Sequence, residues 1–356
     1  MVGRALVVRL DSAGDVLLAG PAVRAVARTR EVVMLCGPQG APAARILPGV
    51  DEVFVWECPW IAAPAPEVSS PALAPLMGFL RGGNFTECVV LTSFHQSPLP
   101  LALLLRLGGI PRITGASVDY AGSLLDVRLK PGEDFPEDQP EPQRALAIAR
   151  AAGHVLPGND PGSLAVLPPP PVTALVGSGP YVVVHPGASV PARAWPPGHH
   201  AALVQGLAAA GHRVVVTGGP SEKTLTAAVA AGTAVDLGGR TDLGALSGVL
   251  AGADAVVTGN TGPAHLAAAV GTPVVSLFSP VVPADRWAPY GVPLELLGDQ
   301  NAACKGTRAR DCPVPGHPCL SSVTPQQVLA AVDRLLAASG PPGPPRPQAQ
   351  LERTAP

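Results

Sequence analysis

The sequence lacks the features of membrane-spanning and nucleic-acid-binding proteins. No apolar run reaches the roughly 18–20 residues that a bilayer-crossing helix needs, and acidic residues stand near the start, where a signal peptide has an apolar core. The formal net charge is only -2 and Lys and Arg form no block, so the positive surface that nucleic acid or an anionic membrane attracts is missing. We therefore expect a cytosolic protein with no transmembrane segment and no nucleic-acid partner.

The six cysteines include no Cys-x-x-Cys pair. Three of them are scattered in the first half and are expected to be small buried residues: Cys36, Cys58 and Cys88. Cys304, Cys312 and Cys319 cluster, and with His317 they offer zinc-like ligands in a Pro-rich loop, with a free thiol cluster or a redox-labile bridge as the alternatives. The sequence has no convincing Asp-x-Asp loop for a divalent ion, so we expect a reaction without metal or cofactor.

Short β-branched runs alternate with helical runs along the whole chain. A length of 356 residues with 47% apolar residues suits two globular domains, and the alternation predicts α/β architecture with parallel sheets. Strands are expected at 5–10, 31–35, 53–55, 88–91, 112–119, 181–184, 213–216, 255–257 and 273–278. Helices are expected at 16–27, 100–107, 141–152, 197–210, 242–251 and 324–338.

Four consecutive prolines mark the predicted domain boundary. Residues 168–171 are all Pro, which neither a helix nor a central strand accommodates. We expect an N-terminal domain at 1–167, a linker at 168–171, a C-terminal domain at 172–339, and a disordered Pro/Gly/Gln tail at 340–356. Because each half opens with a strand, a glycine turn and a helix, both domains are predicted to be Rossmann-like.

The first strand is followed by the sequence Asp11-Ser12-Ala13-Gly14-Asp15. A carboxylate in this position lies at the end of an open α/β sheet where ligands bind, although Asp15 could instead cap the following helix. The segment 92–96 follows another predicted strand and is rich in hydrogen-bonding groups. It is predicted either to line the acceptor side of a site or to be a surface loop.

In the second half, the segment Gly259-Asn260-Thr261-Gly262-Pro263 separates a strand from an Ala-rich helix. The first turn of such a helix offers free N–H groups and a partial positive charge that suit a diphosphate. Thr261 could add a hydroxyl donor, and His265 could reach the same pocket. The alternative is a strand-to-helix turn that binds nothing.

Two other glycine-rich segments do not match known nucleotide motifs. Residues 218–224 nearly match a P-loop, but Glu222 stands where the second glycine is required. The segment Gly177-Ser178-Gly179 precedes a strand, whereas the dinucleotide fingerprint follows one. Both an NTPase and a nicotinamide enzyme are disfavoured.

The segments 9–17, 259–265 and 286–291 resemble the motifs of the heptosyltransferase family of glycosyltransferases. The resemblance implies the GT-B fold, in which two Rossmann-like domains face each other across a cleft. It also implies an inverting transfer of a sugar, heptose by analogy, from a nucleotide diphosphate donor such as ADP-heptose. The acceptor would be a hydroxyl of a glycan, a lipid-linked compound or a small molecule, with Asp15 as the catalytic base.

The resemblance further assigns residues to the donor. The family usually has Lys two residues before a Trp, where this chain has Arg193, so Arg193 would neutralise the diphosphate unless it is a surface loop residue. Asn260 replaces the usual Asp and would select the sugar. The remaining donor candidates are the phosphate-side Ser189, Thr261, Gly262 and His265, the ribose-side Glu222, and Thr241, which could contact the base or cap a helix. An epimerase or hydrolase on this fold, or a non-catalytic nucleotide-binding module, is the alternative function.

Overall fold

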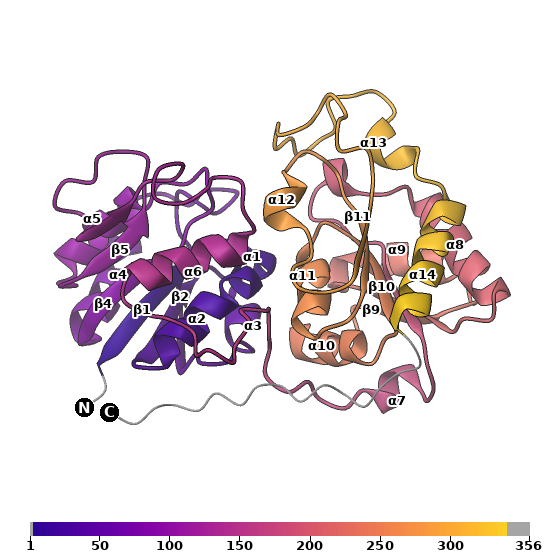
Figure 1. The fold of residues 1–356 in the computed structure, drawn as a ribbon, viewed down its shortest axis with the longest axis horizontal. Coiled ribbons are helices and arrows are strands. Elements are labelled where there is room, and N and C mark those ends of the chain that lie inside the picture. Colours follow the sequence, from indigo (N-terminus) through magenta and orange to yellow (C-terminus); the bar gives the residue numbers. More distant parts are fainter. Residues whose placement is uncertain (1–2, 340–356) are drawn as a thin grey trace. The chain divides into compact units, whose positions relative to one another are not determined.

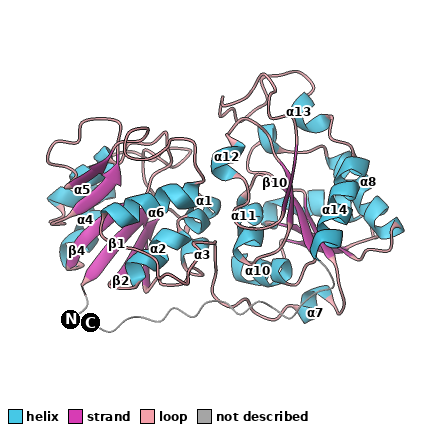
Figure 2. Ribbon diagram, in the orientation of Figure 1, coloured by secondary structure: helices cyan, strands magenta, loops and turns pink. Residues whose placement is uncertain are grey.

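A computed structural model describes residues 3–339 of the chain, which divide after Leu167 into two compact units (Figure 1). Each unit contains one six-stranded sheet with helices packed against it (Figure 2). All strand pairs in both sheets are parallel. The prediction of α/β architecture with two parallel sheets is confirmed.

The sheet of the first unit has the strand order β3-β2-β1-β4-β5-β6. Its strands are β1 (Arg4–Arg9), β2 (Glu31–Cys36), β3 (Glu52–Val55), β4 (Phe85–Val90), β5 (Ile113–Ala116) and β6 (Val127–Leu129). Its helices are α1 (Ala13–Leu18), α2 (Gly20–Ala27), α3 (Ala41–Ala44), α4 (Ser70–Gly82), α5 (Leu99–Leu107) and α6 (Glu141–Ala151). Helix α2 packs against α6, and α4 against α5.

The second unit repeats this arrangement in the order β12-β11-β10-β7-β8-β9. Its strands are β7 (Val182–His185), β8 (Val214–Gly218), β9 (Val235–Gly238), β10 (Ala255–Gly259), β11 (Val274–Leu277) and β12 (Leu294–Leu297). Its helices are α7 (Thr173–Val176), α8 (Pro197–Ala209), α9 (Lys223–Ala230), α10 (Leu243–Ala251), α11 (Gly262–Ala269), α12 (Ala284–Trp287), α13 (Pro318–Ser321) and α14 (Pro325–Ser339), with 3-10 turns η1 (Pro191–Arg193) and η2 (Pro220–Glu222).

The order of the strands determines where ligands can bind. In each unit the first strand lies beside the fourth: β1 pairs with β4, and β7 pairs with β10. The connections leave these two neighbours in opposite directions, which opens a crevice at their carboxyl ends. The central strands are almost entirely buried, as expected for parallel strands covered on both faces.

Some elements differ from the prediction. The helix expected at 16–27 is divided into α1 and α2 at Ala19, because Pro21 has no N–H to donate back to the preceding turn. Helix α4, which contains Pro75, was not predicted. The strands β6, β9 and β12 were not predicted either, since each is short and only partly buried, with no run of apolar residues.

The Pro-rich segment packs against its own unit. A Cβ atom on Gly248 of α10 would lie 2.5 Å from the carbonyl oxygen of Pro170 and 2.7 Å from a methyl group of Val172. Only glycine allows the segment to approach this helix so closely. Within the described residues, none of the helices combines the length and apolar character needed to cross a bilayer. The predicted tail at 340–356 lies outside the described residues.

Candidate functional site

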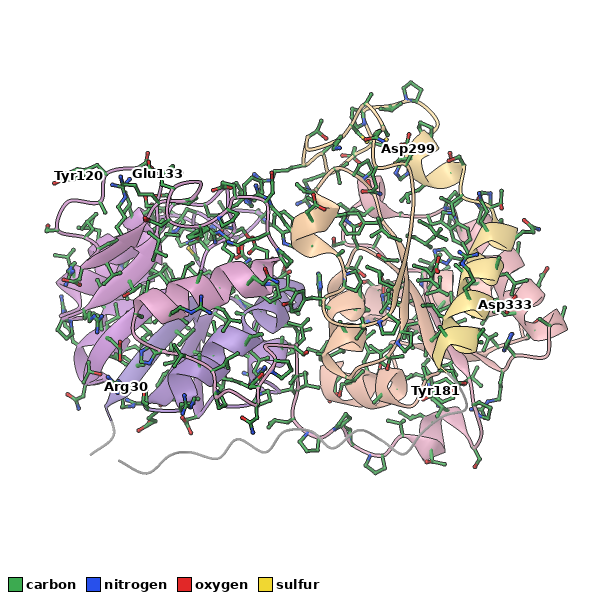
Figure 3. All side chains as sticks on the ribbon, in the orientation of Figure 1. Arg30, Tyr120, Glu133, Tyr181, Asp299 and Asp333 are labelled. Atoms are coloured by element: carbon green, nitrogen blue, oxygen red, sulfur yellow. The ribbon has the colours of Figure 1, made fainter. Side chains whose placement is uncertain are left out.

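The loops that carry the predicted site residues lie at the carboxyl edge of each sheet. Figure 3 marks the two edges in the first unit: Arg30 precedes β2 at the amino edge, whereas Tyr120 and Glu133 lie on loops that follow β5 and β6. Residues 11–15 follow β1 and residues 92–96 follow β4. The two segments therefore meet at the crevice between β1 and β4.

The centre of this crevice is Arg9, the last residue of β1, whose side chain is 3% exposed. Its Nε lies 2.9 Å from Asp11 Oδ2, its Nη2 lies 3.0 Å from Asp15 Oδ1, and its Nη1 lies 3.2 Å from Glu141 Oε2. Nη2 also donates to Ser93 Oγ at 2.8 Å. One guanidinium thus pairs with three carboxylates from two segments that are distant in sequence, residues 11–15 and the start of α6.

Asp15 is the most accessible of the three carboxylates. Its side chain is 21% exposed, compared with 12% for Asp11 and 1% for Glu141. Asp15 lies in the first turn of α1, and Ser12 Oγ donates to Asp15 Oδ2 at 2.7 Å. The N-cap position is occupied by Ser12 and not by Asp15, which lies in the first turn, where the helix dipole favours a carboxylate.

Asp11 has a raised pKa. Burial is the main cause, and the charges of Asp15 and Glu141 raise the pKa further, whereas Arg9 lowers it. Gln96 Nε2 also donates to Asp11 Oδ1, and the Ser93 amide donates to Gln96 Oε1 at 3.1 Å. The segment 92–96 is therefore joined to the carboxylates.

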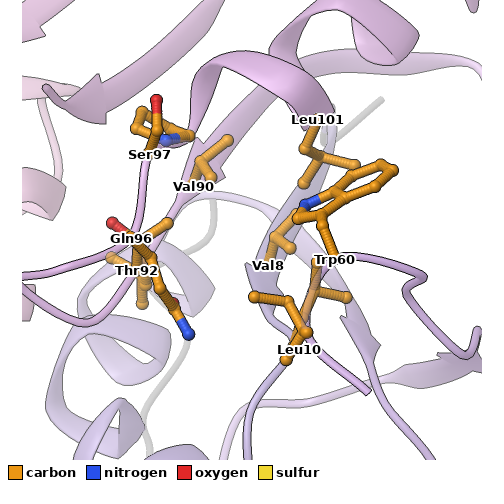
Figure 4. A pocket seen from close by; sticks show the side chains of 11 residues that line it. Val8, Leu10, Trp60, Val90, Thr92, Gln96, Ser97 and Leu101 are labelled. Atoms are coloured by element: carbon orange, nitrogen blue, oxygen red, sulfur yellow. The ribbon is translucent and has the colours of Figure 1, made fainter. Parts of the chain in front are cut away.

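Two hollows adjoin this segment. The smaller is an apolar cavity of about 20 Å³ between Val8, Leu10, Trp60 and Leu101, with Gln96 at its edge (Figure 4), and it has room for roughly one water molecule. The larger is a recess of about 200 Å³ lined by polar, aromatic and aliphatic residues: Phe94, His95, Gln96, Ser97, Ala116, Ser117, Val118, Asp119, Pro131 and Arg144. Only the recess is large enough for a sugar ring.

In the second unit, the crevice between β7 and β10 contains Asn260. This residue follows β10 directly and is only 5% exposed. Neither its amide nitrogen nor its carbonyl oxygen has a hydrogen-bond partner among the described residues. A buried polar atom without a partner costs about 1–3 kcal/mol, and a ligand that supplies both a donor and an acceptor would remove this cost.

The neighbouring residues form the start of α11. Thr261 is the N-cap residue, Gly262 begins the helix, and Pro263 lies in its first turn as predicted. The Thr261 hydroxyl lies 3.4 Å from that of Thr258, and His265 is buried one turn into the helix. The Thr261 amide donates to the Gly259 carbonyl at 2.9 Å and the Ala264 amide to the Thr261 carbonyl at 3.1 Å, and Pro263 has no N–H. The Gly262 amide and the positive end of the helix dipole are therefore what this turn offers to an anion.

The 3-10 turn η1 brings Arg193 to the same crevice. Its carbonyl oxygen lies 3.2 Å from the position of a Cβ atom on Gly259, the last residue of β10. Trp195 anchors the segment, since its indole Nε1 donates to the carbonyl of Val323 at 3.0 Å and its ring packs edge-on against His200. The Arg193 backbone is therefore fixed beside the loop that follows β10.

Glu222 lies at the carboxyl edge of the same sheet. The Gly219 amide donates to Glu222 Oε2 at 2.6 Å, and His185 Nε2 lies 4.0 Å from the same oxygen. A Cβ atom on Gly187 would lie 2.0 Å from Glu222 Oε1, so the carboxylate covers the α-carbon of Gly187. Burial lowers the pKa of His185, and the Glu222 charge acts in the opposite direction.

Two predicted donor-binding residues, Ser189 and Thr241, have fewer described contacts with the other predicted site residues. Ser189 is exposed in the bend that follows β7, and Thr241 lies in the loop between β9 and α10. The cap of α10 is Asp242, whose side chain accepts from the Ala245 amide at 2.7 Å. The alternative role of Thr241 as the cap is therefore wrong.

The cysteine cluster belongs to the core of the second unit. Cys304 and Cys319 are buried, Cys312 is partly buried, and all three are free thiols. Burial and the neighbouring Cys304 raise the pKa of Cys319 to about 11. Across residues 3–339, no three His, Cys, Asp or Glu side chains come together in a way that could hold a metal ion.

Comparison with known proteins identifies relatives of this chain. The family model for glycosyltransferase family 9 (heptosyltransferase) matches residues 117–317, more than half of the chain. Lipooligosaccharide heptosyltransferase 2 of Haemophilus influenzae is 30% identical over 181 residues, which cover 46% of this chain and 50% of that protein. Lipopolysaccharide heptosyltransferase 2 of Escherichia coli is 28% identical over 280 residues, which cover 72% of this chain and 77% of that protein.

Solved structures show the same fold. E. coli ADP-heptose lipopolysaccharide heptosyltransferase II aligns over 94% of this chain and 99% of its own, with a TM-score of 0.72 and 23% identity. E. coli heptosyltransferase WaaC with ADP aligns over 93% of this chain and 99% of its own, with a TM-score of 0.68 and 19% identity. The GT-B fold expected from the sequence motifs is confirmed.

Proposed function

The chain belongs to glycosyltransferase family 9, the heptosyltransferase family, and from this membership we propose that it transfers a sugar from a nucleotide diphosphate donor to an acceptor hydroxyl with inversion. The observation that carries the proposal is the division of chemistry between the two units. The crevice of the first unit contains a partly exposed carboxylate, Asp15. The crevice of the second contains a helix start, Arg193 and the unpartnered amide of Asn260.

We assign the donor to the second unit. The Gly262 amide at the start of α11, the Thr261 hydroxyl and Arg193 would hold the diphosphate. Glu222 would accept hydrogen bonds from the ribose hydroxyls. An acidic residue just after the second strand has this role in dinucleotide-binding sheets, and Glu222 follows β8, the second strand of its unit. WaaC has been solved with ADP and with ADP-2-deoxy-2-fluoro heptose, and we extend ADP-heptose to this chain by analogy.

The reaction we propose is a single displacement. Asp15 accepts the proton of the acceptor hydroxyl, whose oxygen then attacks the anomeric carbon as the bond to the diphosphate breaks. Arg193 and the positive end of α11 stabilise the negative charge that develops on the leaving diphosphate. Attack from the face opposite the leaving group inverts the anomeric centre.

We assign the acceptor to the recess beside Gln96. Its mixture of hydroxyl, amide and charged side chains with the Phe94 ring suits a hydroxyl-rich molecule. A glycan, a lipid-linked compound or a small molecule each satisfies this chemistry, and the names of the relatives favour a lipid-linked saccharide. Because nucleotide sugars are cytosolic metabolites, we propose the cytosol as the place of reaction.

The test of the proposal is the variant Asp15→Asn. Turnover should fall about a hundredfold or more, because the amide cannot accept the acceptor proton, while the dissociation constant for ADP should change little. Asp333→Asn, on the exposed surface of α14, is the matched control and should keep both values. Normal turnover in Asp15→Asn would remove Asp15 as the base.

A further inference from the structure

The ion-pair cluster around Arg9 contains more carboxylates than a structural ion pair requires. One guanidinium charge is opposed by three carboxylate charges from Asp11, Asp15 and Glu141, all within 3.2 Å. Burying charges is costly, and an excess of like charges raises the cost. Stability alone would be served by a single partner for Arg9, so the additional carboxylates call for a functional reason.

The proposed role of Asp15 supplies that reason. A carboxylate paired with a single Arg commonly has its pKa lowered by about 1–3 units, which weakens it as a proton acceptor. Arg9 nevertheless binds Asp15 Oδ1, and Ser12 binds Oδ2, so the side chain is held in one orientation. Orientation by an Arg and basicity at the same carboxylate are normally in conflict.

We propose that Asp11 and Glu141 are positioning residues that balance the charge of Arg9, so that Arg9 orients Asp15 without removing its basicity. This inference rests on the proposed function, in which Asp15 is the base. Each of the two carboxylates lies against a different nitrogen of the guanidinium: Asp11 is 2.9 Å from Nε, in an ion pair without hydrogen-bond geometry, and Glu141 accepts a hydrogen bond from Nη1. Both therefore act on Asp15 through the same group.

The neighbours of Glu141 and Asp11 leave the negative charges of these two residues to act on Arg9 and, through it, on Asp15. Glu141 is almost completely buried, and its Oε1 has no hydrogen-bond partner among the described residues, so little else offsets its charge. On the β4 side, the neutral side chains of Ser93 and Gln96 bind to Arg9 and Asp11. The raised pKa of Asp11, caused by burial and increased by Asp15 and Glu141, agrees with strong coupling within the cluster.

Arg144 is a further cation near the cluster. Arg144, one turn after Glu141 on α6, donates through Nη1 to the carbonyl of Thr92 and lies with its Cζ 5.6 Å from the centre of the Phe135 ring. Arg9 is the cation that Asp11, Asp15 and Glu141 share. Arg9 and the two other carboxylates therefore all act on the charge of Asp15.

The test measures the titration of Asp15 directly. In protein with ¹³C-labelled aspartate carboxyls, the Asp15 resonance is identified by its loss in Asp15→Asn, and its midpoint is followed by NMR in Asp11→Asn and Glu141→Gln. Removing either negative charge should lower the midpoint by about one pH unit. Glu52→Gln, which removes a charge at the amino edge of the same sheet, should leave it unchanged.

The pH dependence of turnover should follow the same shift. In Asp11→Asn and Glu141→Gln the acid limb should move to lower pH by about one unit, and the plateau should fall about threefold to tenfold as the base weakens. Asp11→Glu keeps the charge and should restore most of the wild-type profile. A role confined to folding would lower the melting temperature without moving the Asp15 midpoint.

The other possible results of these experiments would overturn either the inference or the proposed function. An unchanged Asp15 midpoint in folded Asp11→Asn and Glu141→Gln would overturn the inference, as would failure of both variants to fold, since the cluster would then be structural. A shifted midpoint together with full turnover in Asp15→Asn would leave the charge balance standing and refute Asp15 as the base. Failure of the inference and failure of the proposed function are therefore distinguishable.

Discussion

A methyl group on Gly187 would displace Glu222 without changing any residue that is proposed to contact the donor. The added Cβ would lie 2.0 Å from Glu222 Oε1 and 2.4 Å from its Cδ, far closer than atoms can approach. The glycine does not lie in the left-handed region, so the backbone itself accepts Ala. The carboxylate, at the end of a flexible side chain that is 25% exposed, must turn away.

The cost can be estimated from the contacts that are lost. Turning Glu222 away breaks its hydrogen bond from the Gly219 amide, which should lower the free energy of unfolding by about 1 kcal/mol. If the carboxylate holds the ribose, ADP also loses a charge-assisted hydrogen bond of about 1.5–3 kcal/mol. The dissociation constant for ADP, measured by titration calorimetry, should then rise roughly 10- to 150-fold.

A double-mutant cycle provides the sharpest form of this assay. Glu222→Ala and Gly187→Ala should weaken ADP binding to similar extents, and the double variant should be no weaker than either, because both remove the same contact. Pyrophosphate, which has no ribose, should bind all variants equally. Gly198→Ala, where an added Cβ has no neighbour within 4 Å, is the matched control. Additive losses, or normal ADP binding in Gly187→Ala, would refute the reasoning.

Three further predictions concern Arg193 and Asn260 in the second unit and Glu87 in the first. Arg193→Ala should weaken ADP binding by about 1–3 kcal/mol and adenosine binding hardly at all; equal losses would place Arg193 away from the diphosphate. Asn260→Asp should change the ratio of kcat/KM between two nucleotide sugars more than it changes Tm, and a Tm several degrees lower with an unchanged donor ranking would make Asn260 a structural turn residue. Burial acts to raise the pKa of Glu87, but His154 and Arg30 outweigh it and hold the pKa below 4.5. The stability that Glu87 adds is thus present above pH 4.5 and lost as the pH falls through the lowered pKa, so the Tm difference between wild type and Glu87→Gln should narrow below pH 4.5; a constant difference would contradict this linkage.

The sequence predicted the parts of the site that depend on local pattern. Asp15 lies in the first turn of the helix that follows the buried strand β1, and Asn260 lies between the buried strand β10 and helix α11. This pattern alone places both residues at the carboxyl edge of a parallel sheet. The start of α11 was predicted for the same reason, because a proline after glycine marks the first turn of a helix.

Contacts between distant segments could not be predicted from pattern. Arg9 and Glu141 are separated by 132 positions, and their pairing depends on α6 packing near the end of β1. The position of Glu222 over Gly187 likewise depends on β7 lying beside β8. An Arg at the end of a buried strand was the one local signal for the Arg9 cluster, since a buried cation requires acidic partners.

The measurement that tests the account most directly is the release of ADP from ADP-heptose in the presence and absence of cell glycans. Acceptor-dependent release that is lost in Asp15→Asn is the result we predict. Release that is independent of the acceptor would indicate a hydrolase, and tight ADP binding without release would indicate a non-catalytic nucleotide-binding module. Either of these two results would contradict the assignment of this chain as a sugar transferase.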